Sequence, residues 1–169
     1  MIGEGANEGV LARLAALEAR VRELEDHAAI CQLIARYGPA VDGMRRAALR
    51  AMWTPHGTYE TEHHVFRGAD EVGAIVDDPM HLGFVEPGCA HVMSHPVVTL
   101  QGDTAVATNY SRVYQRHGTT WAVVRAAANR WELVRASDGG WRVERRVNRL
   151  LNGSELARSL LANGLEANA

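Results

Sequence analysis

The chain has 169 residues, of which 47% are hydrophobic and 22% charged, and its 18 basic and 20 acidic side chains leave a formal net charge of −2. This balance is typical of one globular domain, without the basic excess of a nucleic-acid-binding protein or an apolar run long enough to span a membrane. All 18 basic residues are arginine, which excludes chemistry that needs a lysine amine, such as Schiff-base formation, pyridoxal-phosphate binding or a P-loop.

The N-terminus and the cysteines bear on location. The opening residues, MIGEGANEGV, lack the basic region followed by an apolar one that begins an export signal, so a cytoplasmic location is expected. Cys31 and Cys89 are far apart and neither lies in a C-x-x-C pair. They are expected to be free thiols with no redox or zinc role.

The first third of the chain is expected to be helical. Between residues 7 and 35, apolar side chains recur at three- and four-residue steps, which predicts an amphipathic helix. These are Val10, Leu11, Leu14, Leu17, Val21, Leu24, Ala28, Cys31 and Ile34. Its early part either projects onto a partner subunit or covers the protein's own sheet. Gly38-Pro39 interrupts this pattern, and a second helix is expected over residues 43–53.

Strands dominate the remainder. Residues 57–66 are expected to form a first strand, followed by a short helix from about Gly68 and a loop over 78–88. From Cys89 onward, β-branched alternating runs predict four consecutive antiparallel strands over 89–100, 104–116, 119–136 and 141–151, then a short helix over 154–164.

This element order predicts an α+β domain in which a curved, mostly antiparallel sheet encloses a cone-shaped pocket closed by helices. We expect a helical extension over residues 1–19, the α+β cone over 20–152 and a helical tail over 153–169.

A candidate catalytic pair is His91 with Asp42. Cys89, His91, Met93 and His95 share one side of their strand by alternation, and Cys89 and Met93 mark that side as sheltered, which suggests that His91 lies in an apolar cavity. Such a histidine is useful as a general base when a carboxylate orients it, and Asp42 in the apolar context PAVDG is the best candidate. Equally, His91 could be a hydrogen-bonded core residue and Asp42 an N-cap of the next helix.

Aromatic and basic side chains complete the candidate pocket. Tyr37, five residues before Asp42, either faces the pocket or is a core aromatic at a helix end. Alternation in the last strand places Arg149 at the end of a mostly apolar face, where it either holds an oxygen of the substrate or forms an ion pair at the rim. The pocket lining is expected to include Trp53, Tyr59, Trp121 and Trp131.

The eight histidines invite a metal site, but none is expected. His91 and His95 are four residues apart in one expected strand, about 13 Å, which is too far to hold one ion. The roles of His63, His64 and His81 stay open.

Taken together, these motifs resemble the SnoaL-like branch of the nuclear transport factor two-like (NTF2-like) superfamily over roughly residues 20–152. The resemblance is carried by the runs at 24–60, 66–72, 89–114 and 130–150, which include RYGPAVD and HPVV. Within the superfamily, the pattern is similar to that of the cofactor-free dehydratases, namely scytalone dehydratase, bile-acid 7α-dehydratase and hexachlorocyclohexane dehydrochlorinase. The resemblance implies a cone-shaped α+β fold.

The resemblance also implies residue roles. Asp42 and His91 fall at the positions of the aspartate and histidine that remove a proton during elimination, and Tyr37 and Arg149 match a tyrosine and an arginine of the bile-acid enzyme. Tyr114 stands where that enzyme has a further aspartate. His117 and Asn129 loosely match a second histidine and an asparagine of the scytalone enzyme.

The sequence therefore predicts a cofactor-independent lyase that eliminates water from a small, largely apolar carbonyl compound, with His91, Asp42, Tyr37 and Arg149 as catalytic residues. Substrate contacts are expected from Tyr59, Trp53, Tyr114, Asn129 and Trp131. A polyketide cyclase, an isomerase or an epoxide-opening enzyme is the alternative within enzymes, and a ligand-binding module without catalysis is the alternative outside them. Relatives imply a homo-oligomer, a trimer or a dimer packed through the outer sheet face, that binds neither nucleic acid nor membrane.

Overall fold

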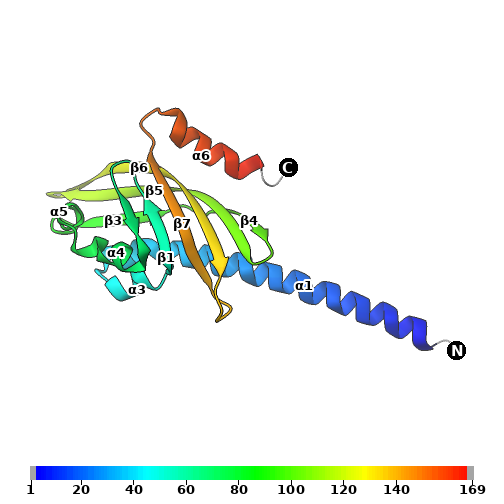
Figure 1. Ribbon diagram of the computed structural model, residues 1–169. Helices are drawn as coiled ribbons and strands as arrows, with labels where there is room; N and C mark the ends of the chain where they lie inside the picture. Colours follow the sequence, from blue (N-terminus) through cyan, green and yellow to red (C-terminus); the bar gives the residue numbers. More distant parts are fainter. Residues whose placement is uncertain (1–2, 167–169) are drawn as a thin grey trace.

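A curved, seven-stranded sheet forms the body of the protein, in the order β2-β1-β7-β6-β5-β3 with β4 paired separately to β5 (Figure 1). This computed structural model describes the backbone of residues 3–166 and the side chains of residues 7–162, so the outer ends of the expected extension and tail lie outside the described residues. Helices precede and interrupt the first strands, and the strands after Cys89 follow one another directly. The expected α+β class, with a curved sheet behind N-terminal helices, is confirmed.

Only one strand pair of the described sheet is parallel, that of β1 with β7. This pairing places the first strand of the chain beside the last, in the interior of the sheet. The strands are β1 (Trp53–Glu60), β2 (Val65–Arg67), β3 (Cys89–Met93), β4 (Val97–Gln101), β5 (Thr104–His117), β6 (Thr120–Arg135) and β7 (Trp141–Leu150).

Two expected strands are each divided in the structure. Residues 57–66 contribute to both β1 and β2, because the chain turns back after Glu60 and pairs with itself. Residues 89–100 form β3 and β4, which pair with successive parts of β5. The break falls at Ser94–Pro96, where proline cannot donate a ladder hydrogen bond. As a result, His95 does not share a strand with His91.

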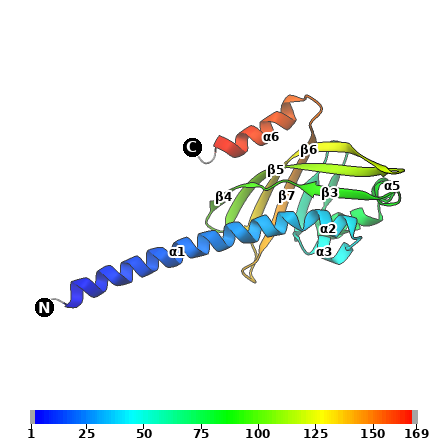
Figure 2. The ribbon, with the colours of Figure 1, turned by 180° about the vertical axis from the view of Figure 1, so that it is seen from behind.

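The helices α1, α2 and α3 lie together, as the rear view shows, and α6 lies apart from them, across the sheet (Figure 2). The helices are α1 (Gly3–Ala35), α2 (Tyr37–Asp42), α3 (Arg46–Arg50), α4 (Gly68–Ala74), the 3-10 turn η1 (Ile75–Asp77), α5 (Pro79–Val85) and α6 (Glu155–Glu166). The terminal helix α6 lies against β5 and β6. None of the helices described is long and apolar enough to cross a membrane.

Three helical expectations need correction. Gly38-Pro39 lies inside α2 rather than between helices, because a proline in the first turn loses no intrahelical hydrogen bond. The second helix is shorter than the expected 43–53, since α3 ends at Arg50 and β1 starts at Trp53. The expected loop over 78–88 contains α5, whose first turn is capped by the Asp78 side chain and begins with Pro79.

The core lies between the sheet and the helices α1, α2 and α4. Its fully buried members include Ile30, Ile34, Val41, Val72 and Trp131. Burial of one such aliphatic side chain contributes roughly 1.5–3 kcal/mol, so the C-terminal part of α1 and the short α2 are held by packing. This packing fixes α2 above β3, where the candidate site lies.

Candidate active site

Asp42 and His91 meet where the end of α2 lies over β3. Nδ1 of His91 is 2.6 Å from Oδ1 of Asp42, and the backbone N–H of His91 donates to Oδ2 at 2.7 Å. The carboxylate is therefore held at two points by one residue. Asp42 does not act as a helix N-cap here, because it is the last residue of α2.

A glycine allows this close approach of helix and strand. A Cβ atom at Gly38 would overlap the carbonyl oxygen of His91, an approach that close-packed interiors do not tolerate. Gly38 thus lets α2 rest directly on the backbone of β3. The position of Asp42, one turn further along α2, follows from this contact.

The carboxylate of Asp42 is ionised. Desolvation, the largest single influence, raises its pKa, but hydrogen bonds from the ring and backbone of His91 and from Cys89 together outweigh desolvation and hold the pKa of Asp42 below its ordinary value. The thiol of Cys89 donates to Oδ1 at 3.3 Å. Desolvation and then the nearby Asp42 raise the pKa of that thiol to about 12, so Cys89 is a neutral donor.

Because Asp42 accepts from Nδ1, the second ring nitrogen of His91 is left for other partners. Within the described residues, Nε2 of His91 has no hydrogen bond, and the ring lines a cavity. The rings of His81 and Phe84 lie 5.6 and 6.4 Å from it, centroid to centroid. This is the arrangement of a general base with an oriented tautomer.

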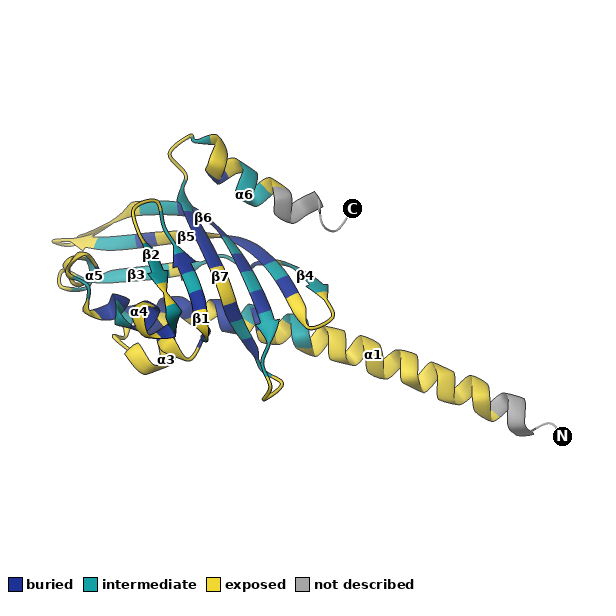
Figure 3. Ribbon diagram, viewed as in Figure 1, coloured by how far each residue is buried: buried dark blue, intermediate teal, exposed yellow. Residues whose placement is uncertain are grey.

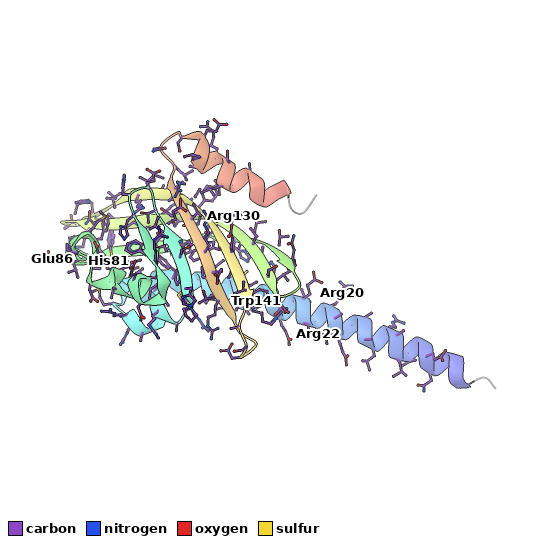
Figure 4. All side chains as sticks on the ribbon, viewed as in Figure 1. Arg20, Arg22, His81, Glu86, Arg130 and Trp141 are labelled. Atoms are coloured by element: carbon purple, nitrogen blue, oxygen red, sulfur yellow. The ribbon has the colours of Figure 1, made fainter. Side chains whose placement is uncertain are left out.

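His81, whose role the sequence left open, is the buried neighbour of this pair. It lies on α5, inside the body of the protein (Figure 4). Its Nε2 is 3.0 Å from the carbonyl oxygen of Val41 and therefore carries the proton, since a carbonyl only accepts. Desolvation lowers the pKa of His81, so the ring is neutral. The sequence missed it because α5 was expected to be a loop.

The cavity has a volume of about 380 Å³, enough for a small organic molecule. Aromatic and aliphatic side chains form most of its wall, with polar groups among them. The apolar lining residues are Tyr37, Tyr59, Phe66, Ile75, Met80, Phe84, Met93 and Val113, and the polar ones are Thr61, His63, His64, Asp78, His81, His91, Ser111, Arg125, Arg146 and Asn148.

Arg146 is the most deeply buried basic residue of the cavity lining. Its guanidinium lies over the rings of Tyr37, Trp131 and Tyr59, at 4.0, 4.2 and 4.4 Å from their centroids. Nε and Nη2 donate to Oδ1 of Asn129 at 3.1 and 2.8 Å. Nη1 is buried and has no hydrogen-bond partner, and no carboxylate of the described residues pairs with Arg146.

An unpaired buried donor on a permanently charged group is costly. A bound oxygen atom that carries negative charge would satisfy it after a small movement of the surrounding side chains, because Nη1 has almost no exposed surface in this structure. The same charge affects Tyr37. Burial and the neighbouring Tyr59 raise the pKa of Tyr37, and Arg146 lowers it by less, so the pKa is raised overall. Tyr37 is therefore a neutral phenol that can donate a hydrogen bond.

A bulge in β7 explains why Arg146, and not Arg149, faces inward. Glu132 of β6 pairs with Arg145, and the next residue, Leu133, pairs with Val143. Glu144 is thus an extra residue, and a one-residue insertion reverses which side chains face the core. Val143 and Arg146 are both buried, although strict alternation would place them on opposite faces.

Arg149 is accordingly placed outside the cavity lining. It forms an ion pair with Glu60 and donates to the carbonyl oxygens of Thr61 and Asn148. Its hydrogen bond to Glu60 is the main cause that holds the pKa of that carboxyl below the ordinary value. The expected inward position of Arg149 is wrong, and the alternative of an ion pair is what the structure has.

The remaining expected substrate contacts divide into three groups. Tyr59, like Tyr37, lines the cavity. Trp53 and Trp131 are buried beneath it, with ring centroids 6.2 Å apart, and Asn129 supports Arg146 from behind. Tyr114 on β5 and Trp121 on β6 are not among the lining residues, and Trp121 is 54% exposed.

The described residues contain one group of potential metal ligands, and it coincides with the catalytic candidates. Ligand atoms of Asp42, Cys89 and His91 lie within 4.8 Å of one another. In this structure the thiol of Cys89 and Nδ1 of His91 are both hydrogen-bonded to Oδ1 of Asp42. A metal ion would have to displace these protons and break both hydrogen bonds, so the observed contacts are those of a hydrogen-bonded acid–base pair.

Comparisons with known proteins agree with this fold. The model of the SnoaL-like domain family matches residues 22–147. An NTF2-like protein with a cystatin-like fold from Novosphingobium aromaticivorans is 40% identical, with a TM-score of 0.85 over 88% of this chain and 96% of that chain. No curated protein matches the chain.

More distant structures show the fold alone. ActVI-ORFA from Streptomyces coelicolor and Aln2 from another Streptomyces strain are each 20% identical with a TM-score of 0.65. They cover 73% and 82% of this chain, and 96% and 95% of their own. The family match over most of the chain and the structural likeness together show that this protein belongs to the SnoaL-like domain family of the NTF2-like superfamily.

Proposed function

We propose that the protein is an enzyme that removes a proton from carbon beside the carbonyl group of a small, largely apolar molecule, and that it thereby eliminates water. The observation that carries this proposal is the two-point contact of Asp42 with His91, which leaves Nε2 free at the cavity wall. The reaction needs no cofactor, since a side chain accepts the proton.

In the proposed step, Nε2 of His91 takes the proton from the carbon next to the carbonyl. The electron pair of the C–H bond forms the C=C bond of an enolate and leaves negative charge on the carbonyl oxygen. When the carbonyl re-forms, that electron pair makes the C=C bond between the α- and β-carbons and the bond from the β-carbon to its hydroxyl breaks. The imidazolium of His91 returns its proton to the leaving hydroxide, which departs as water. Asp42 stabilises the imidazolium that forms. Its ionised carboxylate, with a pKa held below the ordinary value by the His91 contacts despite burial, suits this role.

The negative charge that develops on the carbonyl oxygen also needs a partner. Arg146 carries a fixed charge with one unsatisfied N–H, and Tyr37 is a neutral phenol against its guanidinium. Preorganised donors of this kind in a water-poor site are among the largest contributions to catalysis. We assign to Arg146 the oxygen-holding role that the sequence had suggested for Arg149.

Isomerisation, cyclisation or epoxide opening on the same site would use the same base, so the experiment must separate proton abstraction from its consequence. Exchange of the α-protons of 1-tetralone in D2O, followed by NMR, reports abstraction alone. Loss of water from 3-hydroxy-1-tetralone, followed by absorbance, reports elimination. Both probes are apolar aromatic ketones suited to a cavity with this lining.

His91→Gln should lower the rate of α-proton exchange by about 10²-fold or more, the usual contribution of a general base. His95→Gln is the matched control, because His95 lies outside the cavity, beside His27. Exchange that survives in His91→Gln would remove His91 as the base. If the native protein binds both ketones and exchanges neither, it is a ligand-binding module.

A further inference from the structure

The N-terminal part of α1 projects from the body and carries an exposed apolar stripe. Figure 3 shows its described residues, 7–25, as exposed, and the views in Figures 1 and 2 agree that it extends beyond the sheet. The large apolar side chains of this segment are all at least half exposed, namely Val10 64%, Leu11 57%, Leu14 51%, Leu17 54%, Val21 52% and Leu24 68%. A stripe of this kind on a single chain has nothing to bury it.

The spacing of these residues is that of a coiled coil. Leu14, Val21 and Ala28 repeat every seven residues, and Val10, Leu17 and Leu24 repeat every seven in between. The first set occupies heptad positions a and the second positions d. Asn7 occupies one more a position, so the pattern extends over all the described residues of the projecting segment.

The stripe faces away from the protein's own sheet. With about 100° per residue, the a and d residues lie within about 50° of one line along the helix. Ile30, Leu33 and Ile34, which are buried against the body, lie about 130–230° from that line by the same rule. The stripe and the residues that pack on the sheet therefore lie on different faces of α1. The stripe is not explained by a helix that covers the protein's own sheet.

Charged residues beside the stripe select the orientation of a partner. Arg13 and Arg20 occupy g positions, and Glu18 and Glu25 occupy e positions. In a parallel pair of these helices, each g residue lies opposite the e residue five positions later on the other helix, so Arg13 meets Glu18 and Arg20 meets Glu25. An antiparallel pair would set arginine against arginine and glutamate against glutamate.

We infer that the projecting part of α1 pairs with the same segment of a second copy of this chain in a parallel, two-stranded coiled coil. Leucine at d with β-branched Val21 at a favours two strands, and a polar residue such as Asn7 at one a position fixes the register. From residue 7 to residue 25 the paired segment is about 28 Å long. The interface is independent of the proposed function, because no cavity residue belongs to it.

A charge-swap experiment tests both the partner and the pairing rule. Figure 4 shows Arg20 and Arg22 on the projecting part of α1. The four residues to be changed, Arg13, Glu18, Arg20 and Glu25, are exposed, so their substitution should leave the fold of the body unchanged. The double variants Arg13→Glu/Arg20→Glu and Glu18→Arg/Glu25→Arg place like charges at every e–g contact. Each should weaken dimerisation by roughly tenfold to a hundredfold in sedimentation equilibrium, and a mixture of the two should restore it.

Cysteine cross-linking distinguishes the parallel from the antiparallel arrangement. Val10→Cys at a d position should form a disulfide between copies under mild oxidation, because like d residues face each other only in a parallel pair. Ala12→Cys, on the far side of the same turn, is the matched control and should not cross-link.

Three results would overturn the inference. The native chain could sediment as a monomer at the highest concentration reached, or as a trimer, or both charge variants could dimerise as tightly as the native chain. The last result would place the interface elsewhere, for example on the exposed side of the sheet. Far-UV circular dichroism and thermal unfolding of each variant separate loss of pairing from loss of the fold.

Discussion

Adjacent residues in β7 differ sharply in their surroundings. Arg146 is almost fully buried, over three aromatic rings, whereas Arg145 is on the outer side and forms ion pairs with Glu60 and Glu132. The two side chains are chemically identical and one position apart. A matched pair of substitutions can therefore separate the effect of a charge in the cavity from the effect of a charge on the sheet.

Arg146→Gln should lower the rate of α-proton exchange of 1-tetralone by about 10²-fold, the cost of removing one donor to a developing oxyanion. Arg145→Gln should leave that rate within about twofold, since exposed ion pairs contribute little. NMR exchange rates of both variants, with chemical denaturation as a check of folding, provide the measurement. Equal losses in the two variants would contradict the assignment of Arg146.

Asp42 links the site to the acid stability of the fold. Its pKa in the folded protein is below the ordinary value of 3.8, because the hydrogen bonds from His91 and Cys89 outweigh desolvation. The unfolded chain therefore takes up the proton first as the pH falls. The stabilisation from ionised Asp42 is fully present above about pH 4 and is lost as the pH falls through the folded pKa.

Asp42→Asn should therefore be less stable than the native protein by about 1–3 kcal/mol near neutral pH, the usual contribution of hydrogen bonds to a charged group. The difference in unfolding free energy should shrink below about pH 4, where the native carboxyl becomes protonated. Urea unfolding of both proteins at a series of acidic pH values measures this difference. A difference that grows on acidification would contradict the direction of the pKa shift.

At the residue scale, strand alternation and the apolar context of Asp42 suggested its pairing with His91, and the resemblance supported that pairing over a helix cap and a core histidine. Their contact in the structure agrees with that pairing, and their catalytic roles stay a prediction. Arg146 was missed although it is three residues from Arg149. Residues Glu144 to Arg146 are all hydrophilic, so the sequence does not indicate which of them is the extra residue of the β-bulge.

At the scale of elements, the short α2 depends on one glycine. Gly38→Ala would place a methyl group against the carbonyl oxygen of His91, so α2 must move away from β3 and carry Asp42 with it. Stability should fall by about 1–3 kcal/mol, as for other overpacked positions, and the rate of α-proton exchange should fall with it. Thermal unfolding and the exchange assay measure the two effects.

Gly83→Ala is the matched control for this substitution. Gly83 lies in α5, and a Cβ atom added there would have no neighbouring atom within 4 Å, so alanine meets no obstacle. Because alanine restricts the unfolded chain more than glycine, the control should gain about 0.4–1 kcal/mol. The two substitutions should change the free energy of unfolding in opposite directions. A Gly38→Ala protein as stable as the native one would contradict the close packing of α2.

The order of elements was predictable, but their interruptions were not. Hydrophobic periodicity indicated the long first helix and the run of strands after Cys89, because in each of these segments the pattern repeats many times. The division at Ser94–Pro96 and the bulge at Glu144 arise from pairing with β5 and β6. Such partners are distant in sequence, so a local pattern carries no information about them.

At the scale of the whole molecule, the two halves of α1 have different sources of stability. The C-terminal half is held by burial of Ile30 and Ile34 and by the ion pair of Asp26 with Arg135. The described residues of the N-terminal half make no such contacts within one chain. A helix of this length is only marginally stable in water on its own, so its order depends on a partner.

Hydrogen exchange of the backbone amides should therefore separate the two halves. In the native protein, the segment 7–24 and the segment 28–34 should both be protected. In Arg13→Glu/Arg20→Glu, segment 7–24 should exchange at least about tenfold faster, because an unpaired helix opens readily, while segment 28–34 keeps its protection. Arg22→Glu, which changes a charge outside the e and g positions, is the control. Equal protection of segment 7–24 in all three proteins would mean that the helix is stable without a partner, and the coiled coil would then have no role in ordering it.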